Sequence, residues 1–374
     1  MLAPWERTEY IKDPVLNFKG NPDHPEHDQS GFRNSNTPEQ VDIVTIGDSQ
    51  TYGVGVGREA TWPQQLAAVT GKSVYNMSIS GWGPVQYRTQ IEQALGLHPE
   101  VVMVGLYLGN DIYDAYHLTY EWETGAHLRD PVAFRLIRGF EDRQQMSSPS
   151  RVTAIGQEDQ DKVVVSQRSN LTSYLSSQSK LYALARGFWH MASGYEVGYT
   201  PWTTESRDDY WFRLKQLARI YPEQMIAFES GKVRTILTPS YRMPGINIDD
   251  PRIAEGVEVT LRALGEMYTH CKNQGVELLV VILPTKEYTF SPFLTASEHN
   301  SRAMQLSRLT DRLEHELRER IFAVLGEKMI DYLDMLPALR QTIARDQENP
   351  FFESRNGHFD ASGYGVIARS VALH

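Results

Sequence analysis

The chain has 374 residues, of which 41% are hydrophobic and 22% are charged, a composition typical of a folded globular protein. A formal net charge of −10 argues against an extended phosphate-binding surface, because nucleic-acid affinity depends on lysine and arginine, so we expect no nucleic-acid partner. The single cysteine, Cys271, excludes an intrachain disulfide and a cysteine-based zinc site, and its apolar helical context is typical of a core residue.

Residues 1–40 are rich in proline, asparagine, aspartate and histidine and show no hydrophobic periodicity. This predicts an N-terminal arm that lies over a domain spanning residues 41–374 without forming its core. The run from Asp23 to Asp28 carries side chains that can bind metals, but Pro25 and the irregular spacing favour a solvated loop over a metal site.

The first strand of that domain is predicted over residues 41–46, a β-branched run that ends at Gly47. Residues 73–79 and 101–108 predict two further strands, the second nearly continuous in apolar residues, as buried parallel strands are. Between them, helical spacing follows Pro84, whose fixed φ and missing N–H suit the first turn of a helix.

The region from about 112 to 250 differs, with weak periodicity, many polar residues and four of the seven tryptophans. It predicts an insertion in the domain. Its aromatic residues favour a small satellite core over a sugar-binding platform, although one surface can serve both purposes. The four tryptophans are Trp122, Trp189, Trp202 and Trp211.

Alternating helices and strands resume after the insertion and imply a parallel sheet that is covered on both faces. The longest apolar runs have the length of a strand, so we expect no transmembrane segment. The pattern predicts helices over 253–271, 306–321 and 361–372 and strands over 277–283 and 329–332.

Polar residues follow the first three strands, where the carboxyl ends of a parallel sheet collect ligands. Ser49 lies on a turn from a strand to a helix, a position suited to a nucleophile, although a capping serine has the same local pattern. The backbone N–H groups of Ser49 and Gly81 and the side-chain amide of Asn110 are candidate donors of an oxyanion hole. His358 lies in a glycine-containing loop before the last helix and is the candidate base for Ser49.

Four blocks spread across residues 43–368 resemble the SGNH (GDSL-like) hydrolase superfamily, in that family's order. They are Gly47-Asp48-Ser49, Asn76 to Gly81, Gly109-Asn110-Asp111, and Gly357-His358 followed by Gly363. The resemblance implies a three-layer α/β/α sandwich with a flavodoxin-like parallel sheet. It also implies that Ser49 attacks an ester carbonyl, that His358 transfers the proton, and that Ser49, Gly81 and Asn110 hold the oxyanion.

One departure from the family pattern lies beside the candidate base. The family usually carries an aspartate two or three residues before the histidine, and this chain has Asn356 and Arg355 there. Asparagine can orient an imidazole but adds no negative charge, and the same exchange in a serine protease costs about 10⁴ in turnover. Glu353, Asp360 or a backbone carbonyl could orient His358 instead, the last leaving a Ser–His dyad.

The resemblance implies a serine esterase that acts on small acyl esters, with acetyl esters of a carbohydrate as the expected substrate. The alternatives are a carbohydrate O-acetyltransferase with the same site and a weakened or inactive carbohydrate-binding module, the latter motivated by Asn356. A nucleotide-binding domain is disfavoured because no Gly-x-Gly-x-x-Gly or phosphate-loop motif follows the first strand. Serine, imidazole and amide donors suffice for acyl transfer, so we expect no metal and no organic cofactor.

Two shorter motifs resemble bacterial members of the family that work with polysaccharide-acetylating systems, which makes such a system a candidate partner. They are Asp28-x-x-Gly31-Phe32-Arg33-Asn34 and Pro284-Thr285-Lys286. The sequence is compatible with more than one cellular compartment. An extracytoplasmic location, periplasmic or secreted after loss of an upstream signal or anchor, is favoured over the cytoplasm.

Overall fold

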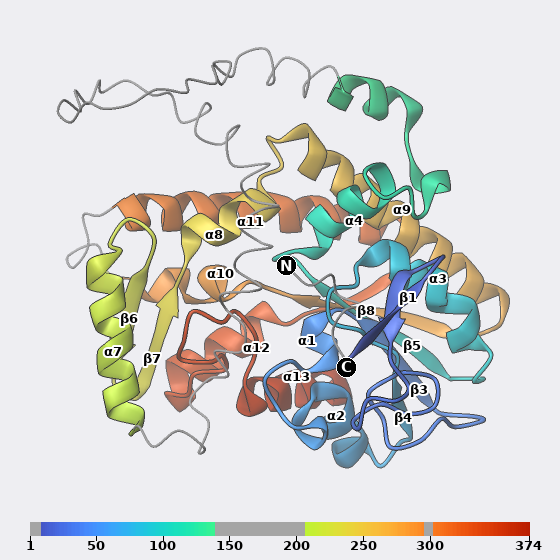
Figure 1. Cartoon of the computed structure of the whole chain (residues 1–374), viewed down its shortest axis with the longest axis horizontal. Coiled ribbons are helices and arrows are strands. Elements are labelled where there is room, and N and C mark those ends of the chain that lie inside the picture. Colours follow the sequence, from blue (N-terminus) through green and yellow to red (C-terminus); the bar gives the residue numbers. More distant parts are fainter. Residues whose placement is uncertain (1–8, 139–205, 295–301) are drawn as a thin grey trace, which may run out of the picture.

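A five-stranded parallel sheet forms the centre of the computed structural model, which describes residues 9–138, 206–294 and 302–374 (Figure 1). Numbered among themselves in chain order, its strands lie side by side as 2-1-3-4-5, the flavodoxin-like order. The strands, in their spatial order, are β4 (Val74–Asn76), β3 (Ile43–Gly47), β5 (Val101–Tyr107), β8 (Glu277–Leu283) and β9 (Asp331–Asp334).

Helices cover both faces of the sheet because successive side chains of each strand point to opposite faces. Val44 and Ile46 pack in the same core cluster as α3 (Pro84–Leu95), α9 (Pro251–Asn273) and α11 (Arg302–Glu327). Ile43, the neighbour of Val44, belongs to the cluster on the other face. That cluster includes α2 (Trp62–Thr70), α12 (Leu336–Gln341) and α13 (Ala361–Leu373). The predicted three-layer α/β/α arrangement is confirmed.

The hydrophobic periodicity predicted where these elements lie in the sequence, but some of their first and last residues differ in the structure. The strand predicted over 277–283 coincides with β8, whereas the one predicted over 329–332 begins two residues later, as β9. The candidate strand over 73–79 is shorter in the structure, where β4 ends at Asn76. Cys271 is fully buried in α9, as its apolar context predicted.

The N-terminal arm contributes to the core, which corrects the expectation that it only covers the domain. It forms a hairpin of β1 (Tyr10–Asp13) and β2 (Asn17–Gly20), and Trp82 donates its indole N–H to the carbonyl of Phe18 at 2.9 Å. The hairpin turns apolar residues inward although their spacing in the sequence shows no period. The buried apolar side chains from the arm are Tyr10, Leu16, Phe18 and Phe32.

The histidine-rich run in the arm is also more buried than expected. His27 is 9% exposed, and its Nε2 lies 2.8 Å from the hydroxyl of Tyr52, while buried Asp28 accepts the Tyr75 hydroxyl at 2.7 Å. The expected solvated loop is therefore anchored in the structure. Among the described residues, no three or more histidine, cysteine, aspartate or glutamate side chains are grouped to hold a metal ion.

The described parts of region 112–250 divide between the main core and a small core of their own. Ile112 and Ile246 belong to the cluster on one face of the sheet, and Phe228 belongs to the cluster on the other face. A separate core packs around Trp211, as the satellite-core interpretation predicted, whereas Trp122 is 43% exposed; Trp189 and Trp202 lie outside the described residues. The limits of the arm and of the insertion stay predictions. The elements here are α4 (Asp111–Tyr120), η3 (Ala126–Leu128), a helical segment over 131–138, α7 (Arg207–Ile220), β6 (Ile226–Ser230), β7 (Val233–Leu237) and α8 (Pro239–Ile246).

Short helices complete the described ranges: α1 (Ser49–Tyr52), η2 (Arg58–Ala60), α10 (Lys286–Phe290), η4 (Ser291–Phe293) and η5 (Thr342–Asp346). In the same ranges, no helix combines the length and apolar character needed to cross a bilayer.

Candidate active site

A sharp turn after β3 presents Ser49 at the carboxyl edge of the sheet. Asp48 is the N-cap of α1, and its Oδ1 accepts the backbone N–H of Gln50 at 2.8 Å. The helix ends after one turn at Gly53, whose φ of 85° lies in the left-handed region that favours glycine. Ser49 is half-buried at the end of this turn.

The loop before α13 brings His358 to Ser49. The hydroxyl of Ser49 lies 2.8 Å from Nε2 of His358, and Nδ1 of the same ring lies 2.5 Å from Oδ1 of Asn356. Asn356 Oδ1 also accepts the backbone N–H of His358 at 2.9 Å, which identifies the facing amide atom as the oxygen. Because an amide oxygen can only accept, the neutral ring carries its proton on Nδ1, and Nε2 is left to accept the Ser49 hydroxyl.

The two carboxylates considered as substitutes for the missing aspartate have other partners. Glu353 is ion-paired with Arg207 and, at 3.1 Å, with Arg234. Asp360 is the N-cap of α13 and accepts the backbone N–H of Gly363 at 2.9 Å. The side chain that contacts Nδ1 of the imidazole is therefore the amide of Asn356.

Asn110 and Gly81 lie on loops that follow the two strands flanking β3. The site is at the point where the strand order reverses, between β3 and β5, which is where ligands bind in this type of sheet. Asn110 Nδ2 donates to Asp114 Oδ2 at 2.9 Å and to Asp111 Oδ1 at 3.3 Å. Gly81 is exposed and has a φ of 90°. Their role as oxyanion donors stays a prediction.

Buried carboxyl groups beside Ser49 were not recognised from the sequence. Asp48 is fully buried, and its Oδ2 lies 3.2 Å from the Ser49 hydroxyl. Burial raises the pKa of Asp48 to about 7, and the nearby charge of Asp114 adds to the rise. Burial also raises the pKa of Asp111, with a further contribution from Asp48. Asp48 and Asp111 therefore release their protons at a higher pH than ordinary aspartates do.

Gln50 is a second residue that sequence reasoning missed. Its side chain is buried, its Nε2 donates to the carbonyl of Gly357 at 3.2 Å, and its Oε1 accepts the backbone N–H of Phe359 at 3.3 Å. The residue after Ser49 thus binds the chain on both sides of His358. No local pattern indicates this contact, because its partners lie about 300 positions away in the sequence.

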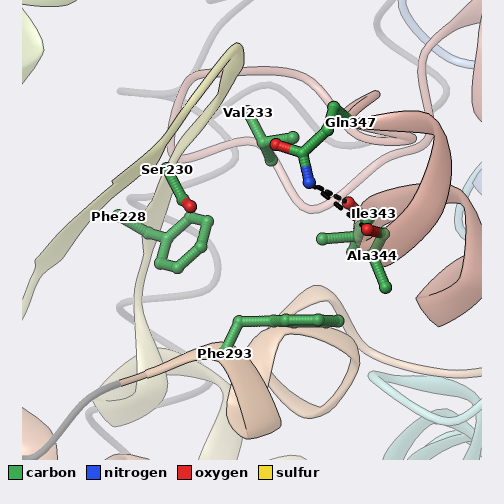
Figure 2. Close-up of a pocket in the computed structure, with 7 residues that line it drawn as sticks. All are labelled: Phe228, Ser230, Val233, Phe293, Ile343, Ala344 and Gln347. Carbon is green, nitrogen blue, oxygen red and sulfur yellow. Dashed lines mark hydrogen bonds between the residues drawn. The ribbon is translucent and has the colours of Figure 1, made fainter.

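A cavity of about 230 Å³ lies elsewhere in the molecule, between the β6–β7 hairpin, η4 and the segment around η5 (Figure 2). Gln347 closes one side and donates from Nε2 to the carbonyls of Ile343 and Ala344, both at 3.3 Å. None of the lining residues belongs to the group around Ser49. The lining consists of Phe228, Ser230, Val233, Phe293, Ile343, Ala344 and Gln347.

Comparison with known proteins finds no family model and no curated protein that matches the chain. Solved structures do match it. A G-D-S-L family protein from Desulfitobacterium hafniense is 11% identical, with 89% of this chain and 99% of that chain covered and a TM-score of 0.37. A GDSL-like lipase from Bacteroides thetaiotaomicron is 10% identical (89% and 86% covered, TM-score 0.32). A catalytic mutant of an acetylxylan esterase from Geobacillus stearothermophilus is 9% identical (90% and 94% covered, TM-score 0.35). The first two are named for the family that the sequence blocks resemble, but similarity at this level does not assign an activity.

Proposed function

We propose that the protein is a serine esterase that acts on small acyl esters through an acyl-enzyme on Ser49, with acetyl groups on a carbohydrate as the expected substrate. One observation carries the proposal: a serine hydroxyl and an imidazole 309 positions apart in the sequence lie within 2.8 Å of each other. They meet at the carboxyl edge of a parallel sheet, where such folds bind ligands. A serine activated by an adjacent base is suited to covalent acyl transfer.

In the proposed reaction, His358 Nε2 removes the proton from Ser49 as its oxygen attacks the ester carbonyl. The tetrahedral intermediate collapses when the C–O bond to the alcohol breaks, and the imidazolium returns the proton to the departing oxygen. Water then attacks the acyl-enzyme with His358 again as base, releasing the carboxylic acid and regenerating the Ser49 hydroxyl. Asn356 Oδ1 holds Nδ1–H throughout, so the ring keeps its tautomer and its direction.

The proposed oxyanion donors are the backbone N–H groups of Ser49 and Gly81 and the amide of Asn110. The longer of the two hydrogen bonds from Asn110, the 3.3 Å contact with Asp111, is the one we expect an oxyanion to replace. Donors of this kind contribute about 10²–10³ each in turnover. The raised pKa of Asp111 favours its neutral form, which limits negative charge near the developing oxyanion.

A carbohydrate O-acetyltransferase is the second candidate, because the same acyl-enzyme can pass its acetyl group to a sugar hydroxyl. The motif around Arg33 favours it through the resemblance noted above, and a polysaccharide-modification system is then the expected partner. Hydrolase and transferase differ in whether the second step excludes water and positions an alcohol. Adding a sugar acceptor to an acetyl-release assay separates the two, because only a transferase yields acetylated sugar.

Covalent labelling tests the proposed nucleophile directly. The wild-type chain should react with a serine-directed fluorophosphonate, and mass mapping should place the adduct on Ser49. Ser49→Ala should abolish the adduct and the release of acetate from an activated acetyl ester. Ser362→Ala is a matched control, because Ser362 is an exposed hydroxyl at the start of α13, and it should change neither result. Absence of the Ser49 adduct, combined with retained polysaccharide binding, would instead identify a non-catalytic carbohydrate-binding module.

A further inference from the structure

Lys286 is a buried basic residue that the proposed reaction does not use. It is the first residue of α10, directly after its N-cap Thr285, and its side chain is 0% exposed. A lysine is rarely buried completely unless its amine has fixed partners. The contacts of Lys286 therefore indicate what this position does.

Both hydrogen-bond partners of the amine belong to the turn just before the proposed base. Lys286 Nζ donates to the carbonyl of Ser354 at 2.7 Å and to the carbonyl of Asn356 at 2.8 Å. Ser354 is itself fully buried, and its hydroxyl accepts the backbone N–H of Asn356 at 3.1 Å. Removing the amine would leave the carbonyl of buried Ser354 without this donor, and the turn would be free to shift.

The turn matters because Asn356 orients His358 without a charge. A carboxylate would hold the ring by its charge as well as by a hydrogen bond, whereas a neutral amide holds it by the hydrogen bond alone, so its position is decisive. That position depends on the backbone of Asn356, which Lys286 holds through its carbonyl. A continuous chain of contacts thus runs from the first residue of α10 to the Ser49 hydroxyl. Its steps are Lys286 Nζ to Asn356 O, Asn356 Oδ1 to His358 Nδ1, and His358 Nε2 to Ser49 Oγ.

We propose that Lys286 is a positioning residue for the base, holding the 354–356 turn so that Asn356 keeps His358 aimed at Ser49. This inference rests on the proposed function of Ser49 and His358. The two hydrogen bonds from Lys286 require N–H donors rather than a positive charge. This matters because burial lowers the pKa of Lys286 to about 7; Glu287 opposes the decrease and Arg242 adds to it. An ammonium and a neutral amine both offer at least two N–H groups for two carbonyls.

Lys286→Met, which keeps the length of the side chain but removes the donors, tests the proposal. We expect kcat for an activated acetyl ester to fall by about 10²-fold with little change in KM, since a misplacement of about 1 Å can cost that much. Arg318→Met is the matched control. Arg318 is also a buried cation, but it pairs with Asp334 and lies over Tyr288. This control should lower the unfolding midpoint and leave kcat within about twofold.

A second readout distinguishes lost hydrogen bonds from a damaged fold. Propylamine, added to Lys286→Ala, should restore part of the rate, whereas tetramethylammonium, which has no N–H, should not. If Lys286→Met does not fold, the same kinetic comparison is made with Lys286→Gln, whose amide retains a donor. Unchanged kcat in folded Lys286→Met, or in folded Lys286→Ala without added amine, would overturn the positioning role.

Proton NMR keeps this test separate from the proposed function. The Nδ1 proton of His358, assigned by its loss in His358→Gln, should give a downfield signal in the wild-type protein and disappear in Lys286→Met. If the wild-type chain neither reacts with the phosphonate nor releases acetate, the proposed function fails, and this signal still decides the role of Lys286. Persistence of the signal in the folded Lys286→Met variant contradicts the proposal, and its loss supports it.

Discussion

Asn356 reproduces the geometry of an orienting carboxylate beside His358 but not its charge. Its Oδ1 lies 2.5 Å from Nδ1, so the amide fixes the direction and tautomer of the ring. In the proposed reaction, the imidazolium formed when His358 accepts the Ser49 proton would have no negative partner at this position. We therefore expect the chain to be a slow esterase, because the imidazolium lacks electrostatic stabilisation and not because the reacting groups are misplaced.

Asn356→Asp should raise the rate of ester hydrolysis at least about tenfold, because a carboxylate at the same place can accept both N–H groups of His358 and stabilise the imidazolium. Asn356→Ala, which removes the acceptor, should lower the rate instead. The measurement is kcat/KM for an activated acetyl ester. If the aspartate variant of an active enzyme is no faster than the wild type, His358 works with Ser49 as a dyad.

The buried carboxyl of Asp48 makes stability depend on pH. Its folded-state pKa, raised to about 7, exceeds that of the unfolded chain, so the folded state keeps a proton that the unfolded chain loses. The contribution of Asp48 to stability is thus complete at acidic pH and declines as the pH rises toward about 7. Asp48→Asn should gain on the order of 2 kcal/mol over the wild type between about pH 5 and pH 8.

Urea unfolding of both chains at the two pH values checks this expectation. Asp42→Asn is the control, because hydrogen bonds from Ser73 lower the pKa of Asp42 and place its titration below this interval. Its difference from the wild type should be the same at both pH values. Equal differences for Asp48→Asn would contradict the assigned titration.

Among the elements, the turn after β3 and the loop before α13 are joined by the side chain of Gln50. Gln50→Leu removes both hydrogen bonds to the chain around His358 while keeping a similar volume. We expect kcat to fall about tenfold or more, since the two reacting groups lose a mutual restraint. Gln65→Leu is the matched control, because Gln65 also donates to a distant carbonyl, that of Ala361, but three residues beyond the proposed base. It should leave kcat unchanged.

The elements themselves were predictable, and the side chains that fix their loops were not. Strands such as β8 follow from an apolar run with a defined end, and α9 from helical spacing. Ser49 and His358 could be proposed because each follows or precedes a recognisable element. Gln50 and Lys286 could not, because their partners are backbone atoms of a distant loop, and backbone acceptors leave no trace in residue identity.

At the scale of the whole molecule, the N-terminal arm is part of the folded core. Phe18 is 4% exposed, packs edge-to-face on Tyr10 with 5.6 Å between ring centroids, and receives the Trp82 hydrogen bond on its carbonyl. An irregular spacing of apolar residues hid this from the sequence, because a hairpin with a tight turn can aim side chains inward without any period. The order of the parallel strands and the two covered faces, by contrast, were foreseeable from alternation and family resemblance.

Phe18→Ala should lower the free energy of unfolding by about 3–5 kcal/mol, the usual cost of removing a buried phenylalanine. Val15→Ala, in the same hairpin but at a side chain that is 59% exposed, should change it by no more than about 0.5 kcal/mol. Urea titration of both variants gives the comparison. A cost for Phe18→Ala as small as that for Val15→Ala would show that the arm detaches without disturbing the core.

The separation of Ser49 and His358 along the chain has a consequence for biosynthesis. The ribosome makes the serine 309 residues before the histidine, about 15–60 s earlier at usual elongation speeds. A nascent chain or fragment that ends after β9 but before residue 358 contains all five strands of the sheet, yet we expect its Ser49 hydroxyl to be as inert as that of any other serine. If the proposed function holds, reactivity toward esters is thus confined to chains that have been translated past residue 358.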